Sequence, residues 1–420
     1  MRRLVGVFGA AAFTCILQAC SSATTTADSP PAPVVEAGAP EAAPRPKPAP
    51  DDAGTVDNGA PSSVYPAPHS APRQLVKLAG PVLPHPTIIP VFFGDDADRA
   101  ATETLLAALP GSAYWKQLAE YGVNDITIGA SVVIAPTAPT TFSLDGIDTK
   151  VSALWTRADS PAPVPDGTQI YAVFFPAQTQ LVQADGSPFC NAGGAYHDSK
   201  GTQFAYAITP HCGATFDDYA LSATHELIEA ATDPYPLVSP AWAGADPSHI
   251  ADRGEVGDLC DYGGRLGGGG GIPMFGTTVE RVFSNARALA GHDPCVPDLG
   301  VPYFGAAPVV KDDLSVDDFI LGTVPAKGAL VKVGETKTVT LELFSDRKVP
   351  AFGVFVQTVD PGTQGASTSI RATLDRKTGE NGEKLHLTIT RTAASDRGDV
   401  VRLVSTSQDV AWSDSLFVGQ

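Results

Sequence analysis

Three polar side chains that could act together lie within about one turn of an expected helix. Residues 222–234 read SATHELIEAATDP and contain His225, Glu226 and Glu229. At about 100° per residue, His225 and Glu229 lie about 40° apart around the helix axis, and Glu226 falls inside the same arc of about 100°. The neighbouring stripe is apolar and comprises Ala220, Ala223, Leu227 and Ala230. All three polar side chains can therefore point into one partly buried cavity, where a pair of carboxylates is costly without a counter-charge.

A divalent cation would supply that counter-charge. Zinc binds imidazole nitrogen and carboxylate oxygen, and a catalytic zinc usually has three protein ligands and a water. His225 and Glu229 offer two ligands, and Glu226 could act as general base toward the water. The motif has the spacing of the His-Glu-x-x-His signature of zinc proteases, but Glu229 stands at the second histidine position. The alternative is an amphipathic helix whose acids are solvated.

A third ligand must come from another part of the chain. Residues 251–264 read ADRGEVGDLCDYGG, and Glu255 and Asp258 are the candidate metal ligands there. The alternatives for these two acids are a solvated loop or calcium binding. Upstream, His197 lies in a glycine-rich segment, from which it could bind the metal or stabilise an oxyanion during catalysis; the alternative is a loop histidine that is hydrogen-bonded locally and has no role in the site.

The elements that must position these residues alternate between strands and helices. Strands are expected at residues 87–94, 126–135 and 168–176, and a helix at 217–232 that ends before Pro234. This α+β or α/β domain spans residues 74–300. A chain of 420 residues has room for two or three domains.

The segment 301–420 has a different pattern, made of short alternating runs separated by turn signals. In KLHLTITR, Leu385, Leu387 and Ile389 face one way and the polar residues face the other. At least six such runs predict an all-β, immunoglobulin-like sandwich. It contains no catalytic cluster, so we expect a structural or adhesive module.

The N-terminus has the features of an export signal. Arg2 and Arg3 precede an apolar run that ends in LQAC, which resembles a bacterial lipobox with Cys20 as the lipidated residue. Residues 1–19 would then be a lipoprotein signal peptide, and 20–73 a disordered Pro/Ala-rich tether. The expected location is a bacterial membrane, at the outer membrane or cell surface, with the lipid as anchor.

The charge and the cysteines agree with export. The net charge of −18 becomes −20 when Arg2 and Arg3 leave with the signal, which disfavours nucleic acid as a partner. Four cysteines remain besides Cys20, and they allow three disulfide pairings. We favour the two that close short loops, Cys190–Cys212 and Cys260–Cys295. Thiolate zinc ligands are the alternative, weakened by the lack of a C-x-x-C pair. His211, His249 and His292 lie in turn-like sequence and are expected at the surface.

The order of several motifs resembles the EXORDIUM-like, phosphate-induced protein family over residues 85–297. The segments that carry the resemblance are YAVFFP (171–176), Cys190, YHDS (196–199), Cys212, HELIEAATDP (225–234), Trp242, EVGDLCD (255–261), RVFSNA (281–286) and Cys295. Plant members have asparagine where this chain has Asp233. The resemblance implies a secreted, cell-surface protein with a zincin-like α/β domain around the His-Glu helix, and it implies no established reaction.

Two functions are compatible with these features. The first is a surface-anchored, zinc-dependent hydrolase of peptidase type, in which Glu226 activates water and His197 assists. The second is a non-catalytic module that binds cell-wall polysaccharide or a protein, with a structural metal or carboxylate site. The sequence does not decide whether the chain is an enzyme.

Overall fold

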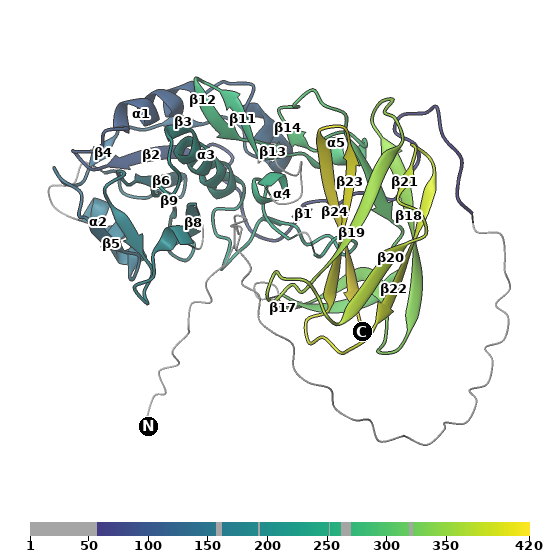
Figure 1. The fold of residues 1–420 in the computed structure, drawn as a ribbon. Helices are drawn as coiled ribbons and strands as arrows, with labels where there is room; N and C mark the ends of the chain where they lie inside the picture. The colour runs from purple at the N-terminus through teal and green to yellow at the C-terminus, as the bar shows by residue number, and fades with distance from the viewer. Residues whose placement is uncertain (1–56, 157–161, 192–193, 252, 262–269, 319–321) are drawn as a thin grey trace, which may run out of the picture.

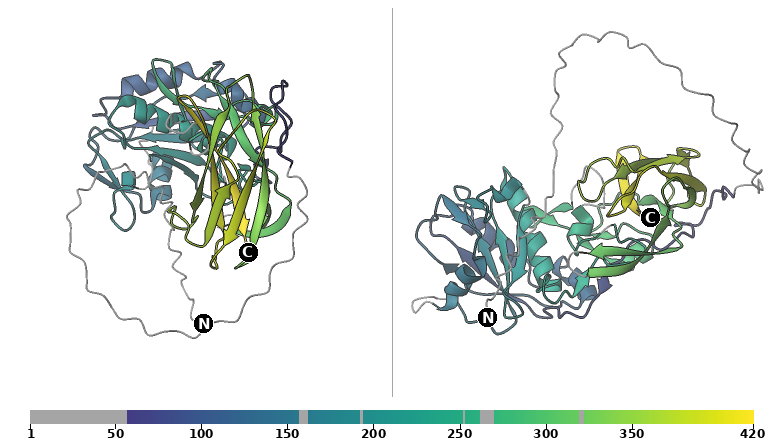
Figure 2. Two further views of the ribbon diagram at one scale, coloured as in Figure 1. Left: turned by 45° about the vertical axis from the view of Figure 1, so that its right-hand side comes forward. Right: turned by 90° about the horizontal axis from the view of Figure 1, so that it is seen from below.

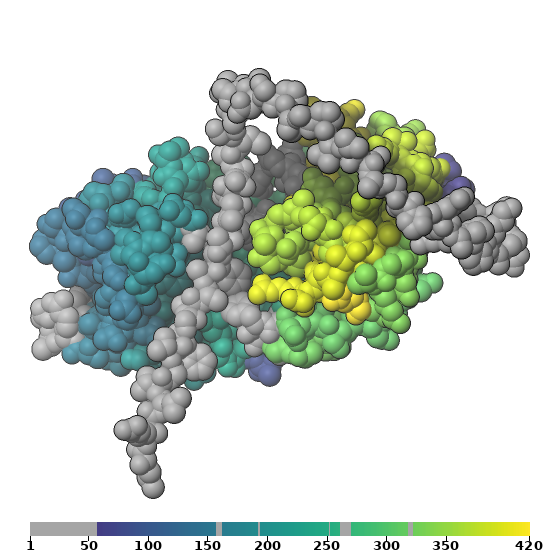
Figure 3. Space-filling model, turned by 60° about the horizontal axis from the view of Figure 1, so that its bottom comes forward, coloured from purple at the N-terminus to yellow at the C-terminus, as the bar shows by residue number. Residues whose placement is uncertain are grey.

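The computed structural model describes residues 57–156, 162–191, 194–251, 253–261, 270–318 and 322–420. The predicted signal peptide, Cys20 and the tether as far as residue 56 lie outside them. The described chain forms an α/β unit and a β-sandwich, which lie side by side as two lobes (Figures 1 and 3).

A mixed sheet forms the centre of the α/β unit, in the order β3-β2-β6-β9-β8, with β4 also pairing with β2. Its strands are β2 (Thr87–Phe92), β3 (Thr127–Ile128), β4 (Val132–Val133), β6 (Gln169–Phe174), β8 (Tyr196–Ser199) and β9 (Ala205–Thr209). All are parallel to their neighbours except β8, which runs antiparallel to β9 at one edge. Every residue of β6 and β9 is buried, as expected of strands covered on both faces.

Helices cover both faces of this sheet. Helices α1 (Arg99–Ala108) and α3 (Phe216–Thr232) contribute to one apolar core, and α2 (Ile147–Thr156) to the core on the opposite face. Helix α3 begins with a capping box between Thr215 and Asp218, which satisfies backbone amides at the helix start. It ends at Thr232, before Asp233 and Pro234. The helix predicted for residues 217–232 is therefore confirmed.

Shorter elements surround the sheet. The short strands are β1 (Val76–Lys77), β5 (Thr141–Ser143), β7 (Gln180–Val182), β10 (Trp242–Ala243), β11 (Gly271–Met274), β12 (Thr277–Glu280), β13 (Val282–Phe283) and β14 (Cys295–Val296). The short helices are the 3-10 helices η1 (Trp115–Tyr121) and η2 (Phe189–Asn191), with α4 (Asp258–Asp261) and α5 (Asn285–Leu289). Strand β12 packs along α3, which brings a further segment to the face of α3 that carries His225.

Both predicted disulfides are present. Cys190 is bonded to Cys212, and Cys260 to Cys295. Disulfides are typical of chains exported to an oxidising compartment, so this part of the export prediction is supported. None of the helices within the described residues is long and apolar enough to cross a membrane.

The C-terminal unit is a β-sandwich of two sheets. One has the order β15-β18-β22-β20 and the other β16-β17-β24-β23-β19-β21. The strands are β15 (Phe304–Pro308), β16 (Asp312–Asp318), β17 (Gly322–Leu330), β18 (Thr336–Ser345), β19 (Phe352–Val359), β20 (Ile370–Leu374), β21 (Thr378–Gly379), β22 (Lys384–Arg391), β23 (Asp399–Ser407) and β24 (Val410–Gly419). The orders β15-β18-β22-β20 and β24-β23-β19 match the A-B-E-D and G-F-C sheets of immunoglobulin domains. The predicted sandwich is confirmed.

Alternating apolar side chains form the sandwich core. In β22, Leu385, Leu387 and Ile389 are buried between half-buried polar neighbours, as their spacing predicts. Two buried polar groups, Arg391 and Asp399, form an ion pair of 2.7 Å within this unit. Each satisfies the other's charge, as buried ions require.

Residues 57–73 differ from the disordered tether that the sequence predicts. They run along the sandwich before entering the α/β unit (Figure 2). Asn381 accepts a hydrogen bond from the Ala67 amide and donates to the carbonyls of Ser62 and Val64. Glu342 accepts from the amide and hydroxyl of Ser70. Side chains of the sandwich hold this segment through these hydrogen bonds and through the stacking of His69 on Phe344, so it is ordered without an apolar periodicity of its own.

Candidate metal centre

The candidate residues converge on one side of α3. Helix α3 supplies His225, Glu226 and Glu229, and the edge strand β8 supplies His197. The loop between β10 and α4 brings Glu255, and the first residue of α4 is Asp258. Within the part of the chain that the structure describes, two groups of three residues are close enough to hold an ion, namely His225 with Glu229 and Asp258, and His197 with Glu229 and Glu255.

In the first group, one imidazole nitrogen faces two carboxylates. His225 Nε2 lies 3.2 Å from Glu229 Oε2 and 3.6 Å from Asp258 Oδ1. Ligand atoms bound tetrahedrally at about 2.0–2.2 Å from zinc lie about 3.3–3.6 Å apart. The two distances from His225 Nε2 lie close to this range, and all three donor atoms lie within 4.8 Å of one another, so the group could hold an ion of this size.

Backbone amides orient both carboxylates of this group. Glu229 Oε1 accepts hydrogen bonds of 3.1 Å from the amides of Gly257 and Asp258. Asp258 Oδ2 accepts one of 3.0 Å from the Glu255 amide. In each carboxylate one oxygen is thus held by the backbone while the other faces His225. Such orientation of the ligands by outer hydrogen bonds is typical of metal centres.

The other nitrogen of His225 faces a further acid. His225 Nδ1 lies 3.7 Å from Oε2 of Glu280, a buried residue at the end of β12. A carboxylate at the second nitrogen of a histidine ligand fixes the ring and makes it more basic. Burial alone would lower the pKa of His225, but Glu229, Asp258 and Glu280 outweigh burial and raise it well above its ordinary value.

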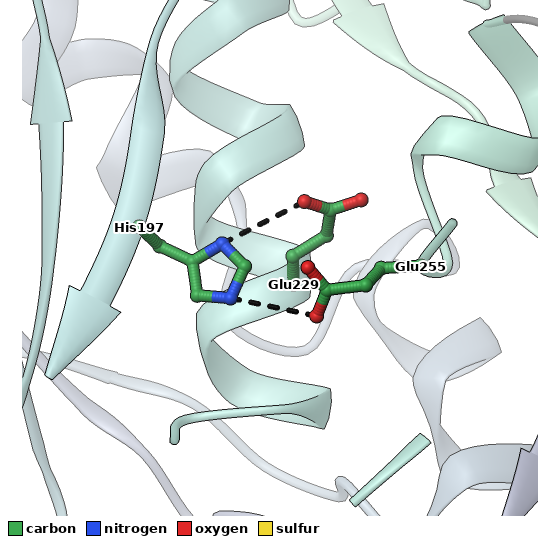
Figure 4. A group of neighbouring side chains, drawn as sticks. All are labelled: His197, Glu229 and Glu255. Carbon is green, nitrogen blue, oxygen red and sulfur yellow. Dashed lines mark ion pairs between the residues drawn. The ribbon is translucent and has the colours of Figure 1, made fainter. Parts of the chain in front are cut away.

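His197 has a different geometry. Its Nδ1 lies 3.2 Å from Glu226 Oε2 and 3.6 Å from Glu229 Oε2, whereas its Nε2 lies 3.5 Å from Glu255 Oε1. Figure 4 shows Glu229 and Glu255 on opposite nitrogens of the ring. Nε2 also lies 3.2 Å from the Asp233 carbonyl oxygen, which can only accept a hydrogen bond. Because both nitrogens face acceptors, His197 suits a doubly protonated bridge between acids better than a chelating ligand.

The electrostatics agree with a bridging role for His197. Burial opposes its charge, but Glu255 and Glu226 raise the pKa of His197 well above its ordinary value. Burial raises the pKa of Glu255 strongly, and it raises that of Asp233 to about 6. These two acids interact with each other and with His197, so they compete for the few positive charges nearby.

The centre concentrates negative charge. The acids that line it are Glu226, Glu229, Asp233, Glu255 and Asp258. Burial raises the pKa of Glu229, whereas His225 outweighs the effect of burial and lowers the pKa of Asp258. Among the described residues, Glu226, Glu229, Glu255 and Asp258 form ion pairs with His197 or His225, and Asp233 Oδ1 accepts a hydrogen bond from the Ala241 amide. A bound divalent cation would relieve this excess of buried negative charge.

The structure brings together every residue singled out from the sequence for this centre, and their roles stay predictions. Sequence reasoning did not single out Glu280 or the participation of Asp233. Glu280 lies in TTVERVF (277–283), which contains no second His, Cys, Asp or Glu that could form a metal-ligand motif with it. Asp233 follows the His-Glu helix directly, and its place at the helix end is the one signal that could have indicated it.

Comparisons with known proteins add little. No family model matches the chain, and no curated protein matches it. Among solved structures, the titin M4 domain is 16% identical and covers 27% of this chain and 95% of its own, with a TM-score of 0.15. The titin M3 domain is 12% identical, with 27% and 96% covered and a TM-score of 0.16. The twitchin kinase region from C. elegans is 13% identical, with 23% and 18% covered and a TM-score of 0.15. Such low scores carry no argument, and the immunoglobulin-like topology rests on the strand order alone.

Proposed function

We propose that the α/β unit is a zincin-like domain that binds one zinc ion through His225 Nε2, Glu229 Oε2 and Asp258 Oδ1. The observation that carries this proposal is the single imidazole nitrogen that faces two carboxylate oxygens at 3.2 and 3.6 Å. The EXORDIUM-like assignment of residues 85–297 forms part of the proposal. The two disulfides support a chain that works outside the cytoplasm. The lipid anchor at Cys20 remains a proposal beside it.

The donor set favours zinc over calcium. Calcium takes six to eight oxygen ligands, and one imidazole with two singly bound carboxylates does not offer that sphere. Imidazole and carboxylate together suit zinc, and three protein ligands leave a position open for chemistry. Asp258 is the preferred third ligand, because Glu255 Oε1 faces His197 instead of His225.

The chemistry would be hydrolysis, with a peptide as the proposed substrate class. Zinc in such a centre polarises a carbonyl group and makes a water acidic near neutral pH. Glu226, one residue from His225, would accept the proton of the attacking water. His197 Nδ1, 3.2 Å from Glu226 Oε2, would orient that carboxylate and stabilise its charge. His197 therefore supports Glu226 in this scheme.

The alternative is a non-catalytic surface module that binds cell-wall polysaccharide or a protein. The observation that favours it is the immunoglobulin-like sandwich, since this architecture occurs in many cell-surface proteins. In that case the metal or carboxylate centre is structural. The two functions differ in whether Glu226 is needed for turnover.

Zinc titration of the purified chain tests the centre. After removal of metal by a chelator, wild-type protein should bind one zinc ion. Asp258→Asn should lose at least about 100-fold in affinity, as expected for a ligand, and Glu255→Gln less than about tenfold. Asp185→Asn, at an exposed turn of the same unit, is the matched control. A wild-type chain that binds no zinc overturns the proposal, and a larger loss with Glu255→Gln would reassign the third ligand.

A further inference from the structure

The sandwich makes direct contact with the loop that carries Asp258. His249 Nδ1 lies 3.4 Å from Asp414 Oδ1 on β24, and His249 Nε2 lies 3.2 Å from the carbonyl oxygen of Ala71. His249 was expected at the surface, but only 3% of it is exposed. The expectation is wrong because the loop is covered by a second unit, which a turn-like sequence cannot show.

Two further contacts fasten the same stretch. Ile250 is buried in a small apolar cluster with Ala326 of β17 and Phe417 of β24. The Lys327 amide of β17 donates a hydrogen bond to the Pro247 carbonyl. One histidine–aspartate contact, one backbone hydrogen bond and one apolar contact therefore tie residues 247–250 to the six-stranded sheet.

The fastened stretch leads directly to the metal centre. The Gly244 amide donates to the Gly254 carbonyl at 2.8 Å, which closes the loop just before Glu255. The Phe283 amide then donates to the Val256 carbonyl at 2.9 Å, and the next two amides hold Glu229 Oε1. The sandwich holds one end of this loop, and the other end presents Asp258 to His225.

We propose that the immunoglobulin-like sandwich is a positioning part of the metal centre, and that His249 and Asp414 are its positioning residues. The inference rests on the proposed zinc site. The sandwich fixes residues 247–250, which restricts the conformations that the 254–258 segment can adopt. Asp258 and the two amides on Glu229 are thereby held near ligand geometry before the ion arrives, and such preorganisation raises affinity. The sandwich thus serves the α/β unit and is more than a display module.

Asp414→Ala in the full chain tests this inference. It removes the acid that faces His249 and touches none of the metal ligands. We expect about tenfold weaker zinc binding, as for loss of an outer-shell partner. We also expect about tenfold faster hydrogen exchange at the Gly257 and Asp258 amides without metal, because the loop opens more often. The matched control is His386→Ala, which breaks a histidine–aspartate pair with Asp375, 3.0 Å apart, in the other sheet of the sandwich.

The two readouts separate the possible outcomes. Weaker zinc binding and faster exchange in Asp414→Ala, with neither in His386→Ala, support the inference. Wild-type values in Asp414→Ala overturn it, and so do equal losses in both variants, which would show general destabilisation. If the wild-type chain binds no zinc but Asp414→Ala still shows faster exchange, the contact between the sandwich and the loop is supported and the proposed zinc site is overturned. If Asp414→Ala does not fold, Asp414→Asn keeps an acceptor for His249 and should show a smaller loss in the same two measurements.

Discussion

Gly257→Ala probes the metal centre without altering any ligand. A Cβ atom at Gly257 would lie 2.8 Å from His225 Nδ1 and 3.0 Å from both His225 Cε1 and Glu229 Oε1. Ordinary contacts of this kind are about 3.5 Å or longer, so the imidazole ring must move by roughly 0.5 Å or more. Metal–ligand distances tolerate deviations of about 0.2 Å. A single methyl group is therefore enough to displace a ligand beyond what the ion accepts.

The expected magnitude follows from this displacement. We expect zinc affinity to fall by about 10–100-fold, the usual effect of disturbing the surroundings of a ligand. This corresponds to about 1.4–2.8 kcal/mol of binding free energy. The cost to folding should be about 1–3 kcal/mol from overpacking. Both effects are steric, since Gly257 does not adopt a left-handed backbone conformation.

The assay is competition for zinc against a chelator of known affinity, together with thermal unfolding with and without zinc. The control is Gly365→Ala in the sandwich, where a new Cβ would meet only Thr363 Oγ1 at 3.4 Å. Gly257→Ala should lose most of the zinc-dependent rise in melting temperature, and Gly365→Ala none of it. If folded Gly257→Ala binds zinc as tightly as wild type, His225 is not a ligand and the geometric reasoning fails.

Two further predictions concern pH and turnover. The fold raises the pKa values of Glu229 and Glu255, so it favours their protonated forms, and this stabilisation is lost as pH rises through the raised values. The pKa values of His197 and His225 are also raised, so the stability that comes from their protonated rings is likewise lost as pH rises. The metal-free chain should therefore lose melting temperature between about pH 5 and pH 9, while zinc-dependent stabilisation grows, because zinc competes with protons for His225; a metal-free melting temperature that rises over this range would contradict the reasoning. Glu226→Gln should keep zinc affinity and lose about 10²–10⁴-fold in any peptide hydrolysis that the wild type shows. Unchanged turnover in that variant would favour the non-catalytic module.

Local patterns in the sequence determined the part of the site that lies on α3. The helical spacing of His225 and Glu229 fixes their common face, because helix geometry depends on neighbouring residues alone. The capping residue and the proline at the two ends set the limits of α3 for the same reason. Alternation in β22 fixed which side chains the sandwich buries. The short sequence separations of the cysteines favoured the pairing that the structure shows.

Tertiary structure decided the rest. Glu255 and Asp258 are three residues apart in one loop, and only the path of that loop turns Asp258 to His225 and Glu255 to His197. Glu280 reaches His225 from β12, far along the chain, and His249 is buried only because the sandwich covers it. The sequence alone determined the elements and the residue types that could bind a metal. The fold decided which oxygen faces which nitrogen, because side-chain direction at a loop depends on contacts between segments that no local pattern encodes.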